Sequence, residues 1–417
     1  MPVVRASELR LGADGLGVDV SARVDGSRLG WRRQRLWFRL PPATGLSEPQ
    51  GDAFVVALLL PAMAAGADLE IDAPLSTALV ESLAHIQELL VGWNAHNPWT
   101  RLHRIRVSGD GNSVTPPGPD RTGLFFTGGV DSMYSLRHAR RHVDHDVDTL
   151  LFVEGFDVPL DAPALAASVR RRLMAVSDAA ARQLVTVRTN LRQLTDQVLS
   201  WEMMHGAALA AVGHLLSHTV QRWIVSSADA YLSNEAYGTA AELDPLWSRP
   251  GLQFLTVGLG LDRISKLGAL AGDHLAQDYL TICWQRRGTA ENCGRCAKCV
   301  RTALQLQVLD ALPRFKTLPT TITPAHIAAI LAEPVHRTFI WEDLAKRLAS
   351  RPDGRPLADA VGHLLARSRR ATHGPGLSDL VTREGRRLAQ EWMRRQLQPR
   401  LPVAIRQRLW RLRELGR

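Results

Sequence analysis

The chain contains few cysteines, few lysines and no long apolar segment. Only 4 of its 417 residues are cysteine, which excludes a disulfide scaffold, and its 32 glycines and 23 prolines are too few for a collagen-like chain. Hydrophobic residues make up 45% and charged residues 22% of the sequence, close to the averages of folded proteins, so global disorder is excluded as well. A chain of this length is expected to form two or three domains.

No segment is predicted to cross a membrane or to direct export. The longest apolar run, residues 53–67, is interrupted by Pro61 and Gly66 and is shorter than the ~20 residues that a bilayer requires. The first residues lack the charged segment followed by an apolar one that marks a signal peptide. We therefore expect a cytoplasmic protein whose cysteines are thiols or metal ligands.

Lysine accounts for only 4 of the 51 basic residues, so the abundance of arginine is weak evidence for phosphate binding. The formal net charge of +10 arises in residues 351–417, which hold 16 basic and 6 acidic residues. In this tail Trp392 and Trp410 lie among arginines. We predict packed helices with a solvated basic face, and binding to nucleic acid or to a membrane surface remains an alternative.

The order of predicted strands and helices divides the chain into three parts. Residues 1–117 are predicted to form a small α+β domain, with strands at 36–40, 69–72 and 102–107 and helices at 52–65 and 76–93. Residues 118–312 alternate strands at 124–126, 149–153, 184–187 and 223–225 with helices at 131–141, 164–181 and 195–217. That alternation indicates an α/β domain with a doubly wound parallel sheet. Residues 313–417 are predicted to be a helical, basic C-terminal region.

A glycine loop follows the first strand of the α/β domain. The sequence Leu124-Phe-Phe-Thr-Gly-Gly-Val-Asp-Ser132 leads from an apolar strand through two glycines into a helix. Glycines let the backbone turn tightly and approach a ligand, and a helix N-terminus offers free N–H groups and a positive dipole end. The loop therefore predicts an anion site suited to phosphate. It has neither the GxxxxGK[ST] nor the GxGxxG spacing.

The hexapeptide Thr127–Ser132 resembles the SGGxDS signature of the PP-loop (N-type) ATP pyrophosphatases, with threonine in place of the first serine. Members of that superfamily cleave ATP between its α and β phosphates and transfer AMP to a substrate oxygen. The resemblance implies that the loop binds ATP through Thr127, Gly128, Gly129, Val130, Asp131 and Ser132, and that Asp131 also orients Mg²⁺.

All four cysteines lie in one cluster, Cys283, Cys293, Cys296 and Cys299, with the spacing C-x9-C-x2-C-x2-C. Four thiolates at these spacings can surround one tetrahedral Zn²⁺, and because they fill its coordination sphere the site is expected to be structural. An iron–sulfur cluster and unliganded thiols are the alternatives. If all four bind metal, no cysteine is left to carry a persulfide, which disfavours sulfur-transfer enzymes that depend on one.

Together, the glycine loop and the cysteine cluster resemble the 7-cyano-7-deazaguanine synthase (QueC) family over about residues 121–310. The resemblance implies an ATP-dependent ligase that adenylates the carboxylate of a deazapurine, after which ammonia attacks to give an amide and then a nitrile. Some QueC-like proteins are associated with antiviral defence operons, where a deazaguanine is joined to a partner protein. The chain departs from the family at Trp201–Ala207 and in the segments 226–231 and 244–248. The substrate and the acceptor therefore stay open.

Further site residues are predicted from their positions. Asp131 is expected to be catalytic through the Mg²⁺ that the resemblance assigns to it. Arg263 and Lys266 follow the Gly258-Leu-Gly260 turn at helical spacing, and they are expected to be catalytic because cationic side chains suit phosphate or carboxylate. His205, on a helix of small residues, is expected to contact ATP, although a structural histidine is equally favoured. Residues in loops after predicted strands are expected to contact the substrate: Glu154, Asp157, Arg188, Ser227 and Asp244.

Three other functions remain open. The first is an RNA-modifying PP-loop enzyme anchored by the basic C-terminus. The second is a nucleotide-binding scaffold or sensor without catalytic activity, whose flanking domains bind a protein partner. The third is a sulfur-inserting enzyme. The expected ligands of the favoured function are ATP, Mg²⁺, a structural Zn²⁺ and a small carboxylate-bearing substrate.

Overall fold

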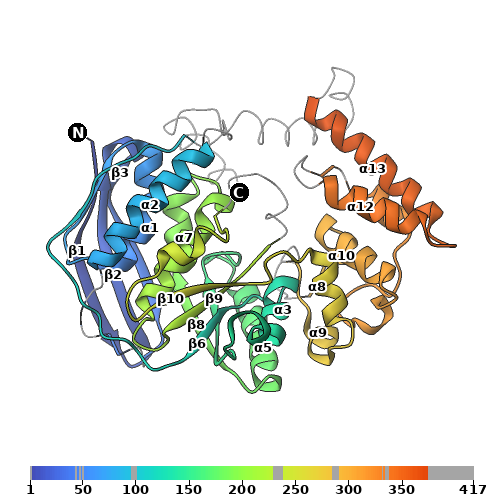
Figure 1. Cartoon of the computed structure of the whole chain (residues 1–417), viewed down its shortest axis with the longest axis horizontal. Helices are drawn as coiled ribbons and strands as arrows, with labels where there is room; N and C mark the ends of the chain where they lie inside the picture. The colour runs from blue at the N-terminus through green and yellow to red at the C-terminus, as the bar shows by residue number, and fades with distance from the viewer. Residues whose placement is uncertain are drawn as a thin grey trace. The chain divides into compact units, whose positions relative to one another are not determined.

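The computed structural model of the chain describes residues 2–42, 45–46, 48, 51–94, 101–228, 238–283, 291–330, 332–333 and 338–373 (Figure 1). These residues fall into two compact units. The first contains Met1–Thr127 and Tyr134–Leu261, and the second contains Gly128–Met133 together with the described residues from Asp262 onward.

The first unit is built on a mixed ten-stranded sheet with the strand order β10-β9-β6-β7-β8-β3-β2-β1-β4-β5. Pairing is antiparallel only at the β8-β3, β3-β2 and β2-β1 contacts and parallel elsewhere. The strands are β1 (Val3–Asp14), β2 (Gly17–Gly26), β3 (Trp31–Leu40), β4 (Asp68–Ile71), β5 (Val107–Gly109), β6 (Thr122–Phe125), β7 (Thr149–Glu154), β8 (Gln183–Thr189), β9 (Arg222–Ser226) and β10 (Gln253–Val257). β6 and β7 are buried along their whole length, as expected for parallel strands covered on both faces.

Helices connect and cover these strands. They are α1 (Gly51–Ala65), α2 (Thr77–Asn94), α4 (Arg140–Val143), α5 (Pro163–Ala179), α6 (Leu191–Thr195) and α7 (Trp201–Leu215), with short 3₁₀ turns η1 (Ser27–Leu29) and η3 (Asp244–Trp247). α1 is apolar on all sides and lies beside α7, whose alanines and glycines permit close packing. α2 is amphipathic, and its leucines and isoleucine at spacings of three and four are buried.

The N-terminal strands and the parallel strands meet where β3 pairs with β8. Phe38 lies opposite Thr189 and Arg39 opposite Arg188. Asn190 extends this contact, because its Oδ1 accepts from the backbone N–H of Trp37 at 2.9 Å and its Nδ2 donates to the Arg35 carbonyl at 2.7 Å. The parallel sheet predicted from the sequence is therefore one half of a larger mixed sheet that also contains the strands of residues 1–117.

The second unit is helical in its described part. It contains the start of α3 (Val130–His138), followed by α8 (Arg263–Leu270), α9 (His274–Tyr279), α10 (Ala297–Val308), the 3₁₀ turn η4 (Leu312–Arg314), α11 (Pro324–Ala328), α12 (Thr338–Ala349) and α13 (Arg355–His373). α12 and α13 pack side by side (Figure 1). Asp262 and Asp273 cap α8 and α9 through their side chains, which is the usual role of aspartate at a helix N-terminus.

Several predicted elements differ from the structure. Of the strand predicted at 102–107, residues 102–106 form no strand and Val107 begins β5. The helix predicted over 195–217 begins only at Trp201, as α7, because α6 ends at Thr195. The strands β1, β2 and β10 were not predicted. The predicted basic helices after residue 373 lie outside the described residues, and the three-domain division stays a prediction. No helix in the described part of the chain is both long and apolar enough to span a bilayer.

Candidate functional site

The glycine loop lies between β6 and α3. The buried apolar run from Leu124 to Phe126 belongs to the sheet, since Phe126 N donates to the Leu151 carbonyl at 2.8 Å. Gly128 has a φ of +74°, a left-handed conformation that glycine adopts without strain. The helix then starts at Val130, and Gly129 accepts from the backbone N–H of Met133 at 2.8 Å and the hydroxyl of Ser132 at 3.3 Å. The local structure is thus the strand, tight turn and helix N-terminus that the sequence predicted.

Asp131, in the first turn of α3, is held by two cations from α8. Its Oδ2 accepts from Arg263 Nη1 and its Oδ1 from Lys266 Nζ, each at 3.0 Å. Arg263 and Lys266 lie three residues apart and therefore on the same side of α8. The Lys266 side chain is 1% exposed, which makes it the least exposed member of the three. The structure thus brings together the three residues predicted to be catalytic.

The charges of this cluster set the ionisation of its carboxylate. Burial alone would raise the pKa of Asp131, but the positive charges of Arg263, Lys266 and Lys298 outweigh burial and hold the pKa below its ordinary value. Asp131 is therefore ionised at neutral pH, and the surplus of positive charge beside a helix N-terminus is an environment suited to an anion.

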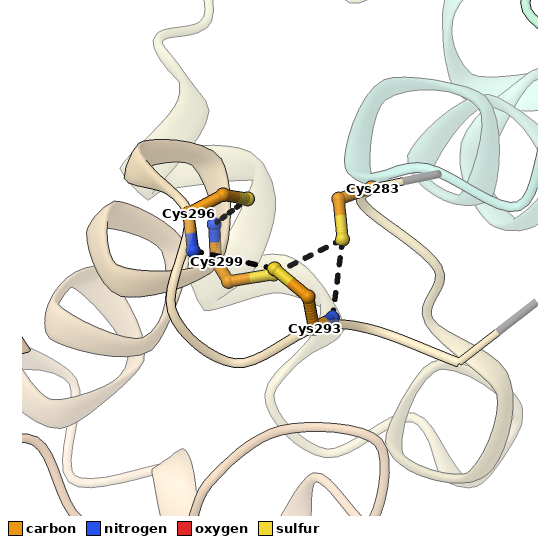
Figure 2. Close-up of side chains that lie close together, drawn as sticks. All are labelled: Cys283, Cys293, Cys296 and Cys299. Atoms are coloured by element: carbon orange, nitrogen blue, oxygen red, sulfur yellow. Dashed lines mark hydrogen bonds between the residues drawn. The ribbon is translucent and has the colours of Figure 1, made fainter. Parts of the chain in front are cut away.

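The four cysteines point toward one another (Figure 2). Their sulfurs all lie within 4.8 Å of one another, and Cys299 Sγ is 3.8 Å from that of Cys293 and 3.4 Å from that of Cys283. Thiolates bound to one tetrahedral Zn²⁺ at about 2.3 Å would have sulfurs about 3.8 Å apart. The cluster therefore has the size of a four-cysteine centre and could hold a metal such as zinc.

Local structure explains why these cysteines converge. Cys296 is the N-cap of α10 and accepts from the backbone N–H of Cys299, while Gly294 takes a φ of +73° in the turn between Cys293 and Cys296. Backbone N–H groups of Cys293 and Cys296 also donate to the sulfurs of Cys283 and Cys293, at 3.2 and 3.3 Å. Such N–H donors stabilise the negative charge that thiolate ligands carry.

Asn292 supports this cluster and was not among the predicted site residues. It lies directly before Cys293 and is buried. Its Oδ1 accepts from the backbone N–H groups of Ile282 and Cys283, and its Nδ2 donates to the carbonyls of Leu280 and Thr317. The only sequence signal for this role was its position next to a predicted metal ligand.

Glu154 and Arg188, both predicted to contact substrate, bind each other. They are register partners at the ends of β7 and β8, and the Arg188 Nε lies 3.1 Å from Glu154 Oε2. Arg170 donates to the other oxygen of the buried Glu154. Gly155 follows with a φ of +98°, and Asp157 is exposed. Glu154 is therefore neutralised from two sides, whereas Asp157 faces solvent.

Ser227 and Asp244 take part in hydrogen bonds within the first unit. Ser227 Oγ donates to the Gly258 carbonyl at 2.6 Å. Asp244 accepts from Thr256 Oγ1 at 2.9 Å and from the backbone N–H of Ala240 at 3.2 Å. These contacts hold the loops that follow β9 and β10. The neighbouring residues 229–237, which include part of the segment that departs from the deazaguanine synthase family, lie outside the described residues.

His205 lies on α7 within a small polar cluster. Its Nδ1 donates to the Glu202 carbonyl at 3.0 Å, which leaves Nε2 to accept from Thr239 Oγ1 at 3.4 Å. Burial lowers its pKa, so the ring is neutral at physiological pH. Beside it, the guanidinium of Arg192 lies 4.6 Å above the ring of Trp201. These contacts suit a structural histidine, the alternative that the sequence left open for His205. Binding of ATP by His205 stays a prediction.

Comparisons of the chain with protein-family models, with curated proteins and with solved structures find no match. What the chain does must therefore follow from the arrangement of its own side chains.

Proposed function

We propose that the chain is an ATP-dependent ligase of the PP-loop type, similar to the 7-cyano-7-deazaguanine synthases. The observation that carries the proposal is the cluster formed by Asp131, Arg263 and Lys266 at the N-terminus of α3, directly after the glycine turn. An anion at this helix start would meet backbone N–H groups and two cations that the fold already holds in place.

The reaction would run in two steps. A carboxylate oxygen of the substrate attacks the α phosphorus of ATP, the α–β anhydride bond breaks, and pyrophosphate leaves. Ammonia or an amine then attacks the activated acyl carbon, AMP leaves, and the nitrogen loses a proton. Holding both reactants in one site supplies the proximity that each step requires.

The residues of the cluster have distinct roles in this scheme. Arg263 and Lys266 bind the departing pyrophosphate, where their charges stabilise the negative charge that develops. The carboxylate of Asp131 orients both cations before ATP binds. Phosphates would compete for these two cations, and the Asp131 carboxylate could then hold Mg²⁺, which prefers carboxylate and phosphate oxygens. Magnesium bound there would neutralise phosphate charge.

The four-cysteine centre has a structural role in the proposal. Its sulfurs leave no coordination position for a substrate, as expected of a centre that holds a fold together. The cysteine sulfurs contact one another, which agrees with a nucleophile other than cysteine in the attack on the adenylate.

The test compares two lysines of the second unit. Lys266 is buried against Asp131, whereas Lys316 pairs with Asp278 and its side chain is 73% exposed. Mg·ATP binding is measured by calorimetry, and pyrophosphate release is measured with a carboxylated deazapurine and ammonium. We expect Lys266→Met to lower pyrophosphate release by about 10²-fold or more, as does the loss of other transition-state contacts, and Lys316→Met to leave it unchanged.

Two results would count against the proposal. Failure of the unmodified chain to bind Mg·ATP would remove its basis, and equal activity of the two lysine variants would remove the role of the cluster. Tight binding of Mg·ATP without turnover on any carboxylate would favour the nucleotide-binding scaffold instead. The RNA-modifying alternative depends on the basic tail, of which residues 374–417 lie outside the described residues, and no contact of the described part favours it.

A further inference from the structure

A four-residue segment, Leu280–Cys283, joins the glycine loop to the four-cysteine cluster. The backbone N–H of Thr281 donates to the Gly128 carbonyl at 2.8 Å. Two residues later the same segment supplies Cys283, whose sulfur lies 3.4 Å from that of Cys299. Gly128 and this segment both belong to the second unit. One short stretch of backbone therefore contacts the turn that precedes α3 and also provides a ligand of the proposed metal centre.

The side chain of Asn292 forms hydrogen bonds with three of the four residues of this segment. The Oδ1 atom accepts from the N–H groups of Ile282 at 2.8 Å and Cys283 at 3.3 Å. The Nδ2 atom donates to the carbonyls of Leu280 at 2.9 Å and Thr317 at 3.1 Å. All of the donors and two of the acceptor positions of this amide are used, and the side chain is buried. Any displacement of Asn292 therefore breaks several buried hydrogen bonds at once.

The position of Asn292 in turn depends on the cysteines. It is bonded directly to Cys293, whose N–H donates to Cys283 Sγ at 3.2 Å. A metal ion bound by both Cys283 and Cys293 would fix the distance between the end of the Leu280–Cys283 segment and the residue that follows Asn292. Without that restraint, the segment would be held by the three hydrogen bonds of Asn292 to it and by two bonds at Leu280, whose carbonyl accepts from Thr317 Oγ1 at 2.7 Å and whose N–H donates to the Ala276 carbonyl at 3.0 Å. Of these contacts, only those of Asn292 reach Ile282 and Cys283.

We infer that occupancy of the four-cysteine centre controls the anion affinity of the glycine loop, with Leu280–Cys283 as the connecting segment and Asn292 as its positioning residue. The anion part of this inference rests on the proposed function, whereas the mechanical connection between centre and loop does not. Binding is reciprocal between coupled sites, so an anion on the loop must tighten the equilibrium binding of the metal by the same free energy.

The first test measures amide hydrogen exchange of the full chain with Zn²⁺ bound and after its removal by a chelator. We expect removal to speed exchange in residues 281–283 and also in residues 129–133. β9, in the first unit, serves as the reference and should not change. Faster exchange at 281–283 with no change at 129–133 would overturn the inference, and so would faster exchange throughout β9, because the metal would then stabilise the whole fold.

The second test compares Asn292→Ala with Thr281→Val. The valine variant loses only the bond from Thr281 Oγ1 to the Tyr279 carbonyl and keeps the N–H that faces Gly128. We expect Asn292→Ala to weaken binding of inorganic pyrophosphate at least about fivefold, the effect of one hydrogen bond of about 1 kcal/mol. Thr281→Val should bind pyrophosphate as the unmodified chain does.

Cobalt provides a readout that a loss of stability alone would not change. In the Co²⁺-substituted chain we expect pyrophosphate to shift the thiolate-to-cobalt absorption bands, and the shift should be absent in Asn292→Ala. An unshifted spectrum in a chain that binds pyrophosphate would overturn the coupling. If the unmodified chain binds no pyrophosphate, the proposed function fails, and the exchange experiment still decides whether centre and loop are connected.

Discussion

His214 makes acid stability a direct test of the packing around α7. The imidazole is fully buried, and its Nε2 donates to the Trp247 carbonyl at 2.9 Å. Its Nδ1 has no hydrogen-bond partner among the described residues. Burial, and then the nearby charge of Arg249, lower the pKa of His214 from an ordinary 6.5 to about 3. Between pH 6.5 and about 3, the ring is therefore neutral in the folded chain although an unfolded chain would protonate it.

The stability that this neutral ring contributes is fully present above pH 6.5 and is lost as the pH falls toward 3. Between these values the unfolded chain binds one proton that the folded chain does not, which costs about 1.4 kcal/mol per pH unit. Acidification from pH 7.5 to pH 5 should therefore reduce the free energy of unfolding by about 2 kcal/mol through His214 alone.

The assay is urea unfolding of the unmodified chain and of His214→Gln at a series of pH values. Glutamine keeps an N–H that can reach the Trp247 carbonyl but cannot take up a proton. Burial lowers the pKa of His205 and of His218 too, and since both are present in the two proteins their effects cancel in the difference. Parallel curves of unfolding free energy against pH would refute the reasoning.

Three further predictions concern the metal centre, a buried ion pair and two helical glycines. Cys299→Ser should abolish binding of one equivalent of Zn²⁺, measured by elemental analysis and competition with a chelator. Arg249→Met should lower the unfolding free energy, measured by urea titration, by about 3–5 kcal/mol. The reason is that the buried Asp52 carboxylate, whose Oδ2 lies 3.1 Å from Arg249 Nε, loses its counter-ion. The double variant Asp52→Leu/Arg249→Met should recover much of that loss. Gly206→Ala should lower the melting temperature, because the added Cβ would lie 1.7 Å from the Gly238 carbonyl oxygen. In Gly362→Ala the added Cβ meets nothing within 4 Å, so this control variant should stabilise α13 by up to about 1 kcal/mol. Equal melting temperatures of the two variants would contradict the close approach at Gly206.

Helix α2 could be predicted from the sequence because its apolar residues recur at spacings of three and four and form one buried face. By contrast, residues 101–106 alternate like a strand but form none. Their amides bind elsewhere: His103 N donates to the Met63 carbonyl, Ile105 N to Gln87 Oε1 and Arg106 N to Asp68 Oδ1. Alternation specifies which side chains are buried, and it does not specify which acceptors lie within reach of the backbone.

The strand β2 carried a sufficient signal. Valines 18, 20 and 24 and Ala22 alternate with polar residues, as a half-buried strand requires. Its place in the sheet could not be read from that pattern. The pairing of β3 with β8 joins residues about 150 positions apart, and only the folded chain shows that an antiparallel set of strands continues a parallel one.

The candidate site was predictable in its parts but not in its assembly. The glycine turn, the cysteine spacing and the basic helix each have a local signature. The contact of Asp131 with Lys266 spans 135 positions, and the bond from Thr281 to Gly128 is made by backbone atoms that any residue except proline could supply. Glu154 was assigned to substrate because it ends a strand, and its two arginine partners became evident only from the fold.

The pairing of β3 with β8 limits how the protein could be shortened. A chain beginning at residue 118 would keep every residue of the glycine loop and the cysteine cluster. It would also leave β8 as an open sheet edge and uncover the face of α7 that α1 buries. Exposed edges of this kind pair with other chains and aggregate. We therefore expect a chain that lacks residues 1–117 to aggregate, because these residues cover both the edge of β8 and this face of α7.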